Sequence, residues 1–247
     1  MGYRIGFDIG STTIKAVVLD ENNQICYKSY ERHKAQVRQK TLDKLVELKK
    51  YTKEPFKFAI SGSGALGLSE QGELPFVQEV FASATGVSKL YPETDCAIEL
   101  GGEDAKILFF QGSVEQRMNS TCAGGTGAFI DQMATLLNMS LEEMNEASLN
   151  YHRLYPIASR CGVFAKTDIQ PLINQGVDKC DLCASIFQAV VDQTITSLAQ
   201  GRKIEGNILF LGGPLYFMSG LRNRFVETLK LSDVQVNCPD TAINFVA

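Results

Sequence analysis

The chain contains one short sequence pattern twice, and this repeat constrains its fold more than any other feature. Residues 5–19 align with residues 96–110. In each copy an apolar run leads into an acid, and a glycine, a small polar run, a lysine and a second apolar run follow. The matching residues are Asp8, Gly10 and Lys15 in the first copy and Glu99, Gly101 and Lys106 in the second. Each copy predicts a strand, a tight turn and a second strand.

The composition of these turns indicates phosphate binding. Turns rich in glycine, serine and threonine expose backbone N–H groups that can surround phosphate oxygens. An acid just before each turn, Asp8 or Glu99, could hold a hydrated Mg²⁺ against that phosphate. Two copies of the pattern therefore predict two lobes that close on one nucleotide.

Composition narrows the class of protein. The 247 residues are 45% hydrophobic and 21% charged, which is typical of a soluble globular protein. A net charge of −4 and a pI near 5.3 argue against nucleic-acid binding. We expect no apolar stretch long enough to cross a membrane, and we expect the N-terminus to enter a strand at once, with no signal peptide. Seven cysteines in such a chain favour reduced thiols or metal ligands, so we expect a cytoplasmic protein.

Hydrophobic periodicity predicts the elements of the first half. Besides the hairpin, we expect strands at 24–30 and 56–60, a tight loop at 61–64, and helices at 40–51 and 75–90. The last helix should bury a face made of Phe76, Val80, Phe81 and Val87. A turn at 91–94 predicts a lobe boundary, and hence lobes at 1–92 and 93–247.

The second half opens with the repeated hairpin and is otherwise mostly helical. The expected elements are strands at 114–117, 208–211 and 234–236 and helices at 126–137, 140–147, 162–175, 180–201 and 215–230. Strands followed by helices in both halves predict an α/β protein of two similar lobes. The chain stops at residue 247, where a further helix is expected, so we interpret it as a fragment of a longer protein.

Two cysteines stand in glycine-rich or polar segments just before predicted helices. Cys122 precedes the helix at 126–137, and Cys161 immediately precedes the helix at 162–175. A thiol near a helix N-terminus is favoured as thiolate, the form that binds iron or zinc. Two such thiols per subunit would give half of a four-thiolate site, which a symmetric dimer would complete. From spacing alone, ordinary buried cysteines remain the alternative.

Other chemically active residues have simpler interpretations. Cys180 and Cys183 share a helix face and are expected to pack in the core, while Cys26, Cys96 and Cys238 lie in or beside apolar strands and are expected to be structural. His33 and His152 stand alone on polar stretches, which argues against catalysis. Lys106 is interpreted as a solvated strand residue. The segment 124–127 is not a Walker loop, because no Gly-Lys-Ser/Thr follows it.

Five segments together resemble a known family. They are residues 6–15, 99–106, 122–131, 159–165 and 211–214, and they occur in family order. They resemble the ATP-dependent activators (archerases) of 2-hydroxyacyl-CoA dehydratases, with their benzoyl-CoA reductase ATPase relatives. The two cysteine segments are the most specific part, because the glycine turns alone would match any actin-like ATPase or sugar kinase.

The resemblance implies a two-lobed actin-like ATPase fold (acetate/sugar kinase–Hsp70–actin) with ATP, ADP and Mg²⁺ between the lobes. It also implies a homodimer that shares one [4Fe–4S] cluster. The cluster ligands would be Cys122 and Cys161 of each subunit. The nucleotide would be bound by Ser11, Thr12, Thr13 and Lys15, by Gly101, Gly102 and Glu103, and by Gly212, Gly213 and Pro214. Asp8, Glu99 and Glu103 would be the catalytic acids.

The implied function is electron transfer driven by ATP. Binding and hydrolysis of ATP would reshape the dimer, and an electron would pass from the cluster to a dehydratase-like iron–sulfur protein. A ferredoxin or flavodoxin would be the donor.

Four residues depart from the family pattern. Glu99 replaces an aspartate, Ser83 stands where a histidine is expected, Lys166 replaces an acid, and Pro214 follows the last glycine pair. Two alternative functions therefore stay open. One is a small-molecule kinase of the same fold, for which Asp104 is the candidate general base. The other is a non-catalytic nucleotide-binding module of a larger protein.

Overall fold

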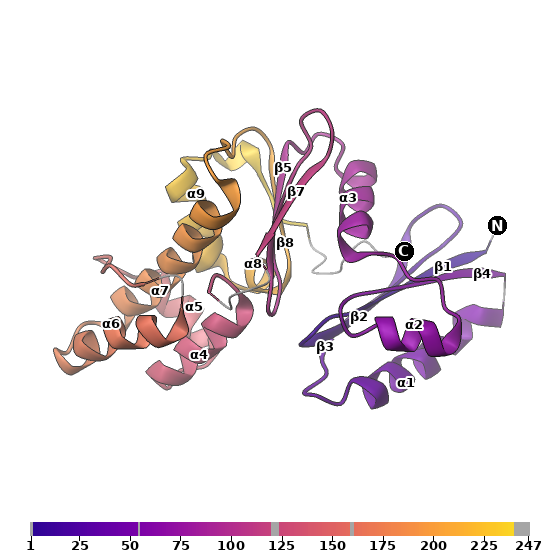
Figure 1. The fold of residues 1–247 in the computed structure, drawn as a ribbon, viewed down its shortest axis with the longest axis horizontal. Helices are drawn as coiled ribbons and strands as arrows, with labels where there is room; N and C mark the ends of the chain where they lie inside the picture. The colour runs from indigo at the N-terminus through magenta and orange to yellow at the C-terminus, as the bar shows by residue number, and fades with distance from the viewer. Residues whose placement is uncertain (1, 54, 120–123, 159–160, 240–247) are drawn as a thin grey trace. The chain divides into compact units, whose positions relative to one another are not determined.

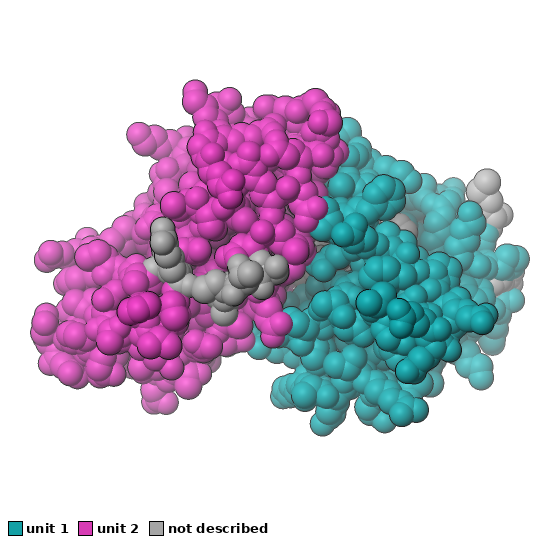
Figure 2. All heavy atoms as spheres, viewed as in Figure 1, with its two compact units in different colours: residues 1–92, 241–247 teal, residues 93–240 magenta. Residues whose placement is uncertain are grey.

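A computed structural model describes residues 2–53, 55–119, 124–158 and 161–239 of the chain. The described residues form two compact units, with a division between Pro92 and Glu93 (Figure 2). Each unit is built around its own mixed β-sheet.

The described part of the first unit contains a four-stranded sheet with the order β3-β2-β1-β4. Its strands are β1 (Tyr3–Ile9), β2 (Thr13–Leu19), β3 (Ile25–Arg32) and β4 (Phe56–Ser61). Its helices are α1 (Val37–Leu48), followed by a 3₁₀ turn (Lys49–Lys53), α2 (Leu66–Gly72) and α3 (Glu79–Leu90). Figure 1 shows α1 and α2 on the same face of the sheet.

The described part of the second unit contains a five-stranded sheet with the order β7-β6-β5-β8-β9. Its strands are β5 (Cys96–Leu100), β6 (Ala105–Phe109), β7 (Glu115–Asn119), β8 (Ile208–Leu211) and β9 (Val236–Asn237). Its helices are α4 (Gly127–Leu137), α5 (Leu141–Ser148), α6 (Gly162–Asn174), α7 (Lys179–Thr194), α8 (Gly213–Phe217) and α9 (Ser219–Leu229). These helices lie on one side of the sheet (Figure 1).

The two sheets repeat one topology. In each, the first three strands form an antiparallel meander, and the fourth strand runs parallel to the first. The repeated sequence forms the first hairpin of each meander, so the prediction of an α/β fold with duplicated hairpins is confirmed.

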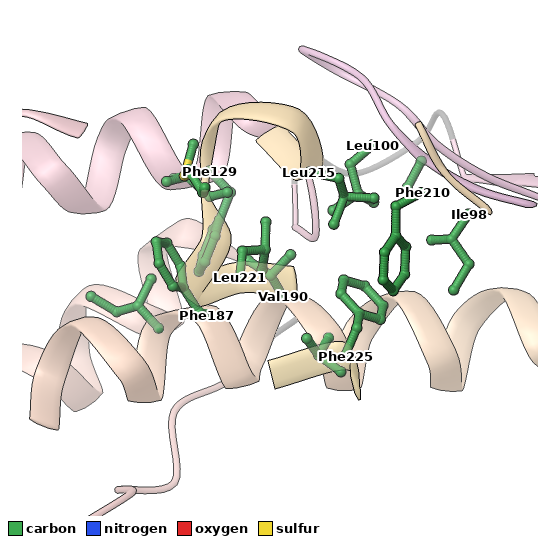
Figure 3. Packing of buried hydrophobic residues seen from close by; sticks show 14 of the residues in the cluster. Ile98, Leu100, Phe129, Phe187, Val190, Phe210, Leu215, Leu221 and Phe225 are labelled. Atoms are coloured by element: carbon green, nitrogen blue, oxygen red, sulfur yellow. The ribbon is translucent and has the colours of Figure 1, made fainter. Parts of the chain in front are cut away.

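Helix α7 forms the centre of the second core. Its side chains Phe187 and Val190 are fully buried, and Figure 3 shows them close to Leu221. Phe225 of α9 contacts Phe210 of β8, with 5.7 Å between ring centroids, which joins the helical layer to the sheet. Parallel pairing with β5 holds β8 in the sheet and so places the loop that follows β8.

The prediction that no segment is long enough to span a membrane needs correction. Among the described residues, one helix, Lys179–Ala199, is long and apolar enough by composition. It consists of α7 and a π-helical turn (Ile195–Ala199), and 67% of its most apolar window is buried within the protein. Its apolar character is therefore explained by its place in the core.

Two helices differ from the prediction: one begins later than expected, and the other is divided in two. The helix expected at 75–90 begins at Glu79, because Phe76 forms a β-bridge with Ile60 of β4. Its buried face consists of Ala82, Ser83, Gly86 and Val87, whereas Phe81 is 67% exposed. The helix expected at 215–230 is divided at Met218, whose backbone is extended.

Candidate functional site

The first repeated hairpin places an ion pair beside its turn. Asp8 and Lys15 are cross-strand partners, and Lys15 Nζ lies 2.6 Å from Asp8 Oδ2. Asp8 is 2% exposed. The Gly10 N–H donates to the Thr13 carbonyl at 2.9 Å, which closes the turn. Ser11 at the turn tip is exposed, so its hydroxyl and backbone are accessible to a ligand.

The second hairpin repeats this arrangement at the same register. Glu99 and Lys106 are cross-strand partners, with Lys106 Nζ 3.5 Å from Glu99 Oε1 and 3.0 Å from Asp104 Oδ2. The Gly101 N–H donates to the Asp104 carbonyl at 2.8 Å. Glu103 at the tip is exposed.

The interpretation of Lys106 as a solvated residue is therefore wrong. Its side chain is 1% exposed, because β6 is buried on both faces. Alternation along the strand does not reveal such a position.

Two buried acid–lysine pairs at matching positions require an explanation. Removing two charges from water costs energy that apolar side chains of the same volume would not cost. The repetition of the pair directly behind each turn therefore favours a role in the chemistry of the turns over a role in stability. An acid and an ammonium at this place could position a metal ion and a phosphate group.

The loop after β8 packs against the second turn. Gly212 has φ of 88°, and a Cβ there would lie 2.0 Å from the Leu100 carbonyl oxygen, so only glycine fits. Gly213 and Pro214 form the first turn of α8. Pro214, which departs from the family pattern, is accommodated here, since a proline in the first helical turn replaces an N–H that has no helical partner.

The N-terminus of α4 is bonded to the second turn. The N–H groups of Gly127 and Ala128 donate to the carbonyls of Gly101 and Gly102 at 3.0 and 2.8 Å. A Cβ on Gly127 would lie 3.3 Å from Pro214 Cγ. Three segments that the sequence analysis treats separately, the second turn, the 124–127 segment and the loop after β8, therefore form one cluster.

Two residues near the first turn are missing from the predicted site. His33 was expected on a polar stretch, but it is 4% exposed and contacts Gly10. Ser61, the cross-strand neighbour of Asp8, is fully buried, and its hydroxyl has no hydrogen-bond partner among the described residues. The predicted tight loop at 61–64 was the sequence signal that could have pointed to Ser61. Gly62 of this loop lies so close to Asp8 that a Cβ at Gly62 would be 2.5 Å from Asp8 Oδ1.

Of the two predicted cluster ligands, only Cys161 lies within the described residues. It is the N-cap residue of α6, it is partly exposed, and its side chain makes no capping hydrogen bond within the described part of the chain. A thiolate here would face the positive end of the α6 dipole. Cys122 lies outside the described residues.

The other described cysteines are poorer candidates, because iron binds the thiolate form. Burial raises the pKa of Cys96 and Cys183 to about 12. Burial also raises the pKa of Cys26, Cys180 and Cys238. Cys183 packs in the core as expected, with its sulfur 3.9 Å from that of Met139. Cys26 was expected to be structural and lies in β3, where its side chain is exposed.

Within the described parts of one chain, no three potential metal-ligating side chains come together. The position and chemistry of Cys161 fit a thiolate ligand. A four-thiolate centre would therefore need Cys122 and the same residues of a second copy.

The duplicated topology and the two acid–turn–lysine hairpins define a protein of the actin-like ATPase fold. Residues 5–241 match the model of the BadF/BadG/BcrA/BcrD ATPase family, so the chain belongs to this family.

Three comparisons describe its relatives. The (R)-2-hydroxyglutaryl-CoA dehydratase activating ATPase of Acidaminococcus fermentans is 28% identical over 85% of this chain and 82% of its own length. The crystal structure of component A of that dehydratase matches with a TM-score of 0.87 and 26% identity, over 100% of this chain and 95% of the other. The activator of 2-hydroxyisocaproyl-CoA dehydratase from Clostridium difficile, solved with bound ADPNP, matches with a TM-score of 0.84 and 27% identity, over 98% and 90%.

Proposed function

We propose that this protein is an ATP-dependent electron-transfer activator of a 2-hydroxyacyl-CoA dehydratase or a related CoA-ester reductase. The observation that carries the proposal is the buried acid–lysine pair behind a tight glycine turn, present twice at the same cross-strand register. Membership of an ATPase family and likeness to dehydratase activators support it.

In this proposal the two turns bind the phosphates of ATP. The exposed tips carry Ser11 and Glu103, and the accessible backbone N–H groups of the tips would donate to phosphate oxygens. Asp8 and Glu99 would orient hydrated Mg²⁺. The complete proposed nucleotide set is Ser11, Thr12, Thr13, Lys15, Gly101, Gly102, Glu103, Gly212, Gly213 and Pro214.

Cys122 and Cys161 of two copies would hold one [4Fe–4S] cluster. Bound there, the cluster would supply one-electron transfer to an iron–sulfur partner, with a ferredoxin or flavodoxin as donor. Lys166 follows Cys161 by five residues in α6, and its positive charge distinguishes this chain from the family pattern.

Helix α4 supports coupling between nucleotide and cluster. Its first two N–H groups are bonded to Gly101 and Gly102, and the segment before it leads to Cys122. A change in the second turn on nucleotide binding would therefore act directly on the start of α4. Coupling of two sites requires such a shared element.

The structure offers no support for Asp104 as the general base that the kinase alternative requires. The Asp104 carboxylate is paired with Lys106 at 3.0 Å and lies inside the turn, where a Cβ on Gly101 would be 2.1 Å from Asp104 Oδ1. A general base has to accept a proton from the substrate, and this carboxylate is already engaged.

The proposal is tested by activation of a purified 2-hydroxyacyl-CoA dehydratase under anaerobic conditions. The dehydratase should form its enoyl-CoA product only when this protein, ATP and a one-electron reductant are all present. ADPNP should not replace ATP. The Lys15→Met variant should lose activation and bind ADPNP at least about tenfold more weakly, the equivalent of one charged hydrogen bond.

Lys28→Met serves as the matched control, because Lys28 is an exposed lysine on the neighbouring strand β3. It should bind ADPNP like the wild type. Equal ADPNP affinity of the Lys15→Met variant and the wild type would contradict the assignment of the first turn. Product formation without ATP would contradict the function.

A further inference from the structure

The buried imidazole of His33 makes two defined hydrogen bonds near the first phosphate turn. Nε2 lies 3.1 Å from the Gly10 carbonyl oxygen, and Nδ1 lies 3.2 Å from the Ala35 backbone nitrogen. A carbonyl can only accept and an N–H can only donate. The ring is therefore neutral, with its proton on Nε2 and an accepting Nδ1.

The backbone of His33 also holds the turn. Its N–H donates to the Thr12 carbonyl at 3.1 Å. The ring and the main chain of one residue thus bind carbonyls on both sides of Ser11, the exposed residue at the tip. The first turn is therefore clamped from outside the hairpin as well as by its own bond from Gly10 to Thr13.

The two residues after His33 adopt an unfavourable backbone conformation that supports the contacts of His33 with the turn. Lys34 has φ of 48° and Ala35 has φ of 63°, although neither is glycine. This conformation is unfavourable for a residue that carries a Cβ. The pair turns the chain so sharply that the Ala35 N–H reaches the imidazole two residues back. Strain of this kind is retained where a precise local geometry matters.

We propose that His33 is a positioning residue for nucleotide binding. By fixing the Gly10 carbonyl it orients the Gly10–Ser11–Thr12 turn so that the N–H groups and hydroxyls of the turn converge on phosphate oxygens. The imidazole itself does not contact the nucleotide. This inference rests on the proposed nucleotide site, and it adds a residue that the five family-like segments do not include.

The first test compares ADPNP affinity by calorimetry in the presence of Mg²⁺ for three variants. His33→Gln can still donate to the Gly10 carbonyl, so it should bind within about threefold of the wild type. His33→Asn keeps an acceptor near the Ala35 N–H but is too short to donate to the Gly10 carbonyl. His33→Phe keeps an aromatic ring without a hydrogen-bonding atom. Both should bind roughly tenfold more weakly, the worth of one hydrogen bond. His152→Phe, at the exposed second histidine, is the control and should bind like the wild type.

The second test is ¹⁵N NMR of the imidazole rings. The chain has two histidines, so His152→Phe assigns the His33 signals directly. The free protein should show the neutral Nε2–H tautomer, and that tautomer should persist with ADPNP bound. A proton on Nδ1, or rapid exchange between tautomers, would overturn the clamp whether or not nucleotide binds.

The outcomes separate the two proposals. If the wild type does not bind ADPNP, the proposed function fails and this inference falls with it. If the wild type binds and His33→Asn binds as tightly as His33→Gln, only the role of His33 is overturned. The Gln and Asn variants differ by one methylene, so this contrast stays decisive even if His33→Phe does not fold.

Discussion

At the scale of single residues, the protein buries charged side chains, although removing a charge from water is unfavourable. The ammonium of Lys106 is 1% exposed and lies between the carboxylates of Glu99 and Asp104. Lys15 keeps a little more contact with solvent beside Asp8. We interpret both pairs as prearranged groups of the phosphate turns, whose cost in stability is tolerated because the site requires them.

Removal of the Lys106 charge should therefore be severe. Lys106→Met leaves the buried Glu99 carboxylate without the ammonium beside it, so the free energy of unfolding should fall by roughly 3 kcal/mol. The double variant Glu99→Gln/Lys106→Met should recover most of this loss. Urea denaturation measures the free energy of unfolding of each variant. Lys89→Met, at an exposed residue of α3, is the control and should change this free energy by about zero. A loss below about 0.5 kcal/mol for Lys106→Met would contradict the buried ion pair.

Two glycines with positive φ separate the stability cost of backbone strain from that of close packing. Gly212 and Gly176 have φ of 88° and 74°, but a Cβ at Gly176 would meet nothing within 4 Å. Gly176→Ala should cost about 1 kcal/mol of stability from backbone strain alone. Gly212→Ala should cost roughly 3 kcal/mol or more, because its Cβ would also meet the Leu100 carbonyl. Thermal unfolding checks the order, and equal costs would show that the loop after β8 is not packed on β5.

At the scale of elements, the repeated hairpins could be predicted from sequence because the whole signal is local. Apolar runs and turn residues define each hairpin without reference to the rest of the chain. The start of α3 could not be predicted in this way, since the 75–78 segment is held by pairing with β4, far away in sequence. Lys106 was misinterpreted for a similar reason, because both faces of β6 are buried by parts of the protein outside the strand, which the sequence of the strand does not reveal.

The segment that leads to Cys161 is held by side-chain acceptors from helices. Asp181 of α7 accepts the N–H groups of His152 and Arg153 at 2.7 and 3.0 Å. Ser185 accepts that of Tyr155 at 2.8 Å, and Asp168 of α6 accepts that of Ala158 at 2.8 Å. These bonds keep an irregular segment in one path as far as Ala158.

Asp181 should give this anchoring a dependence on pH. The two backbone N–H groups, first His152 and then Arg153, lower the pKa of the Asp181 carboxyl. A carboxyl with a lowered pKa stabilises the fold above its unfolded pKa of about 3.9, and this contribution is lost as pH falls further. Asp181→Asn should therefore flatten the decline in stability below about pH 4, as followed by urea denaturation at a series of pH values. An unchanged decline would show that the two bonds do not favour the ionised form.

At the scale of the whole molecule, the proposed function connects a nucleotide site with a redox centre. The duplicated topology was predictable because the sequence repeat is visible, and the resemblance to dehydratase activators added the two cysteines. His33 was not predictable, since it belongs to no motif and reaches the first turn from the end of β3, whereas the predicted loop at 61–64 gave a local signal for Ser61 beside Asp8. Cys161 is placed at the start of α6, with a thiol that is free to bind a metal.

The most direct test of the central claim is the iron content of the protein purified without oxygen. Wild type should hold about four irons and four acid-labile sulfides per dimer, with a visible absorption that air removes. Cys161→Ser should lose the iron, while Cys26→Ser, at an exposed cysteine of β3, should keep it. Wild-type protein that holds no iron after anaerobic reconstitution, or Cys161→Ser protein that retains it, would contradict an electron-transfer activator and leave a nucleotide-binding ATPase.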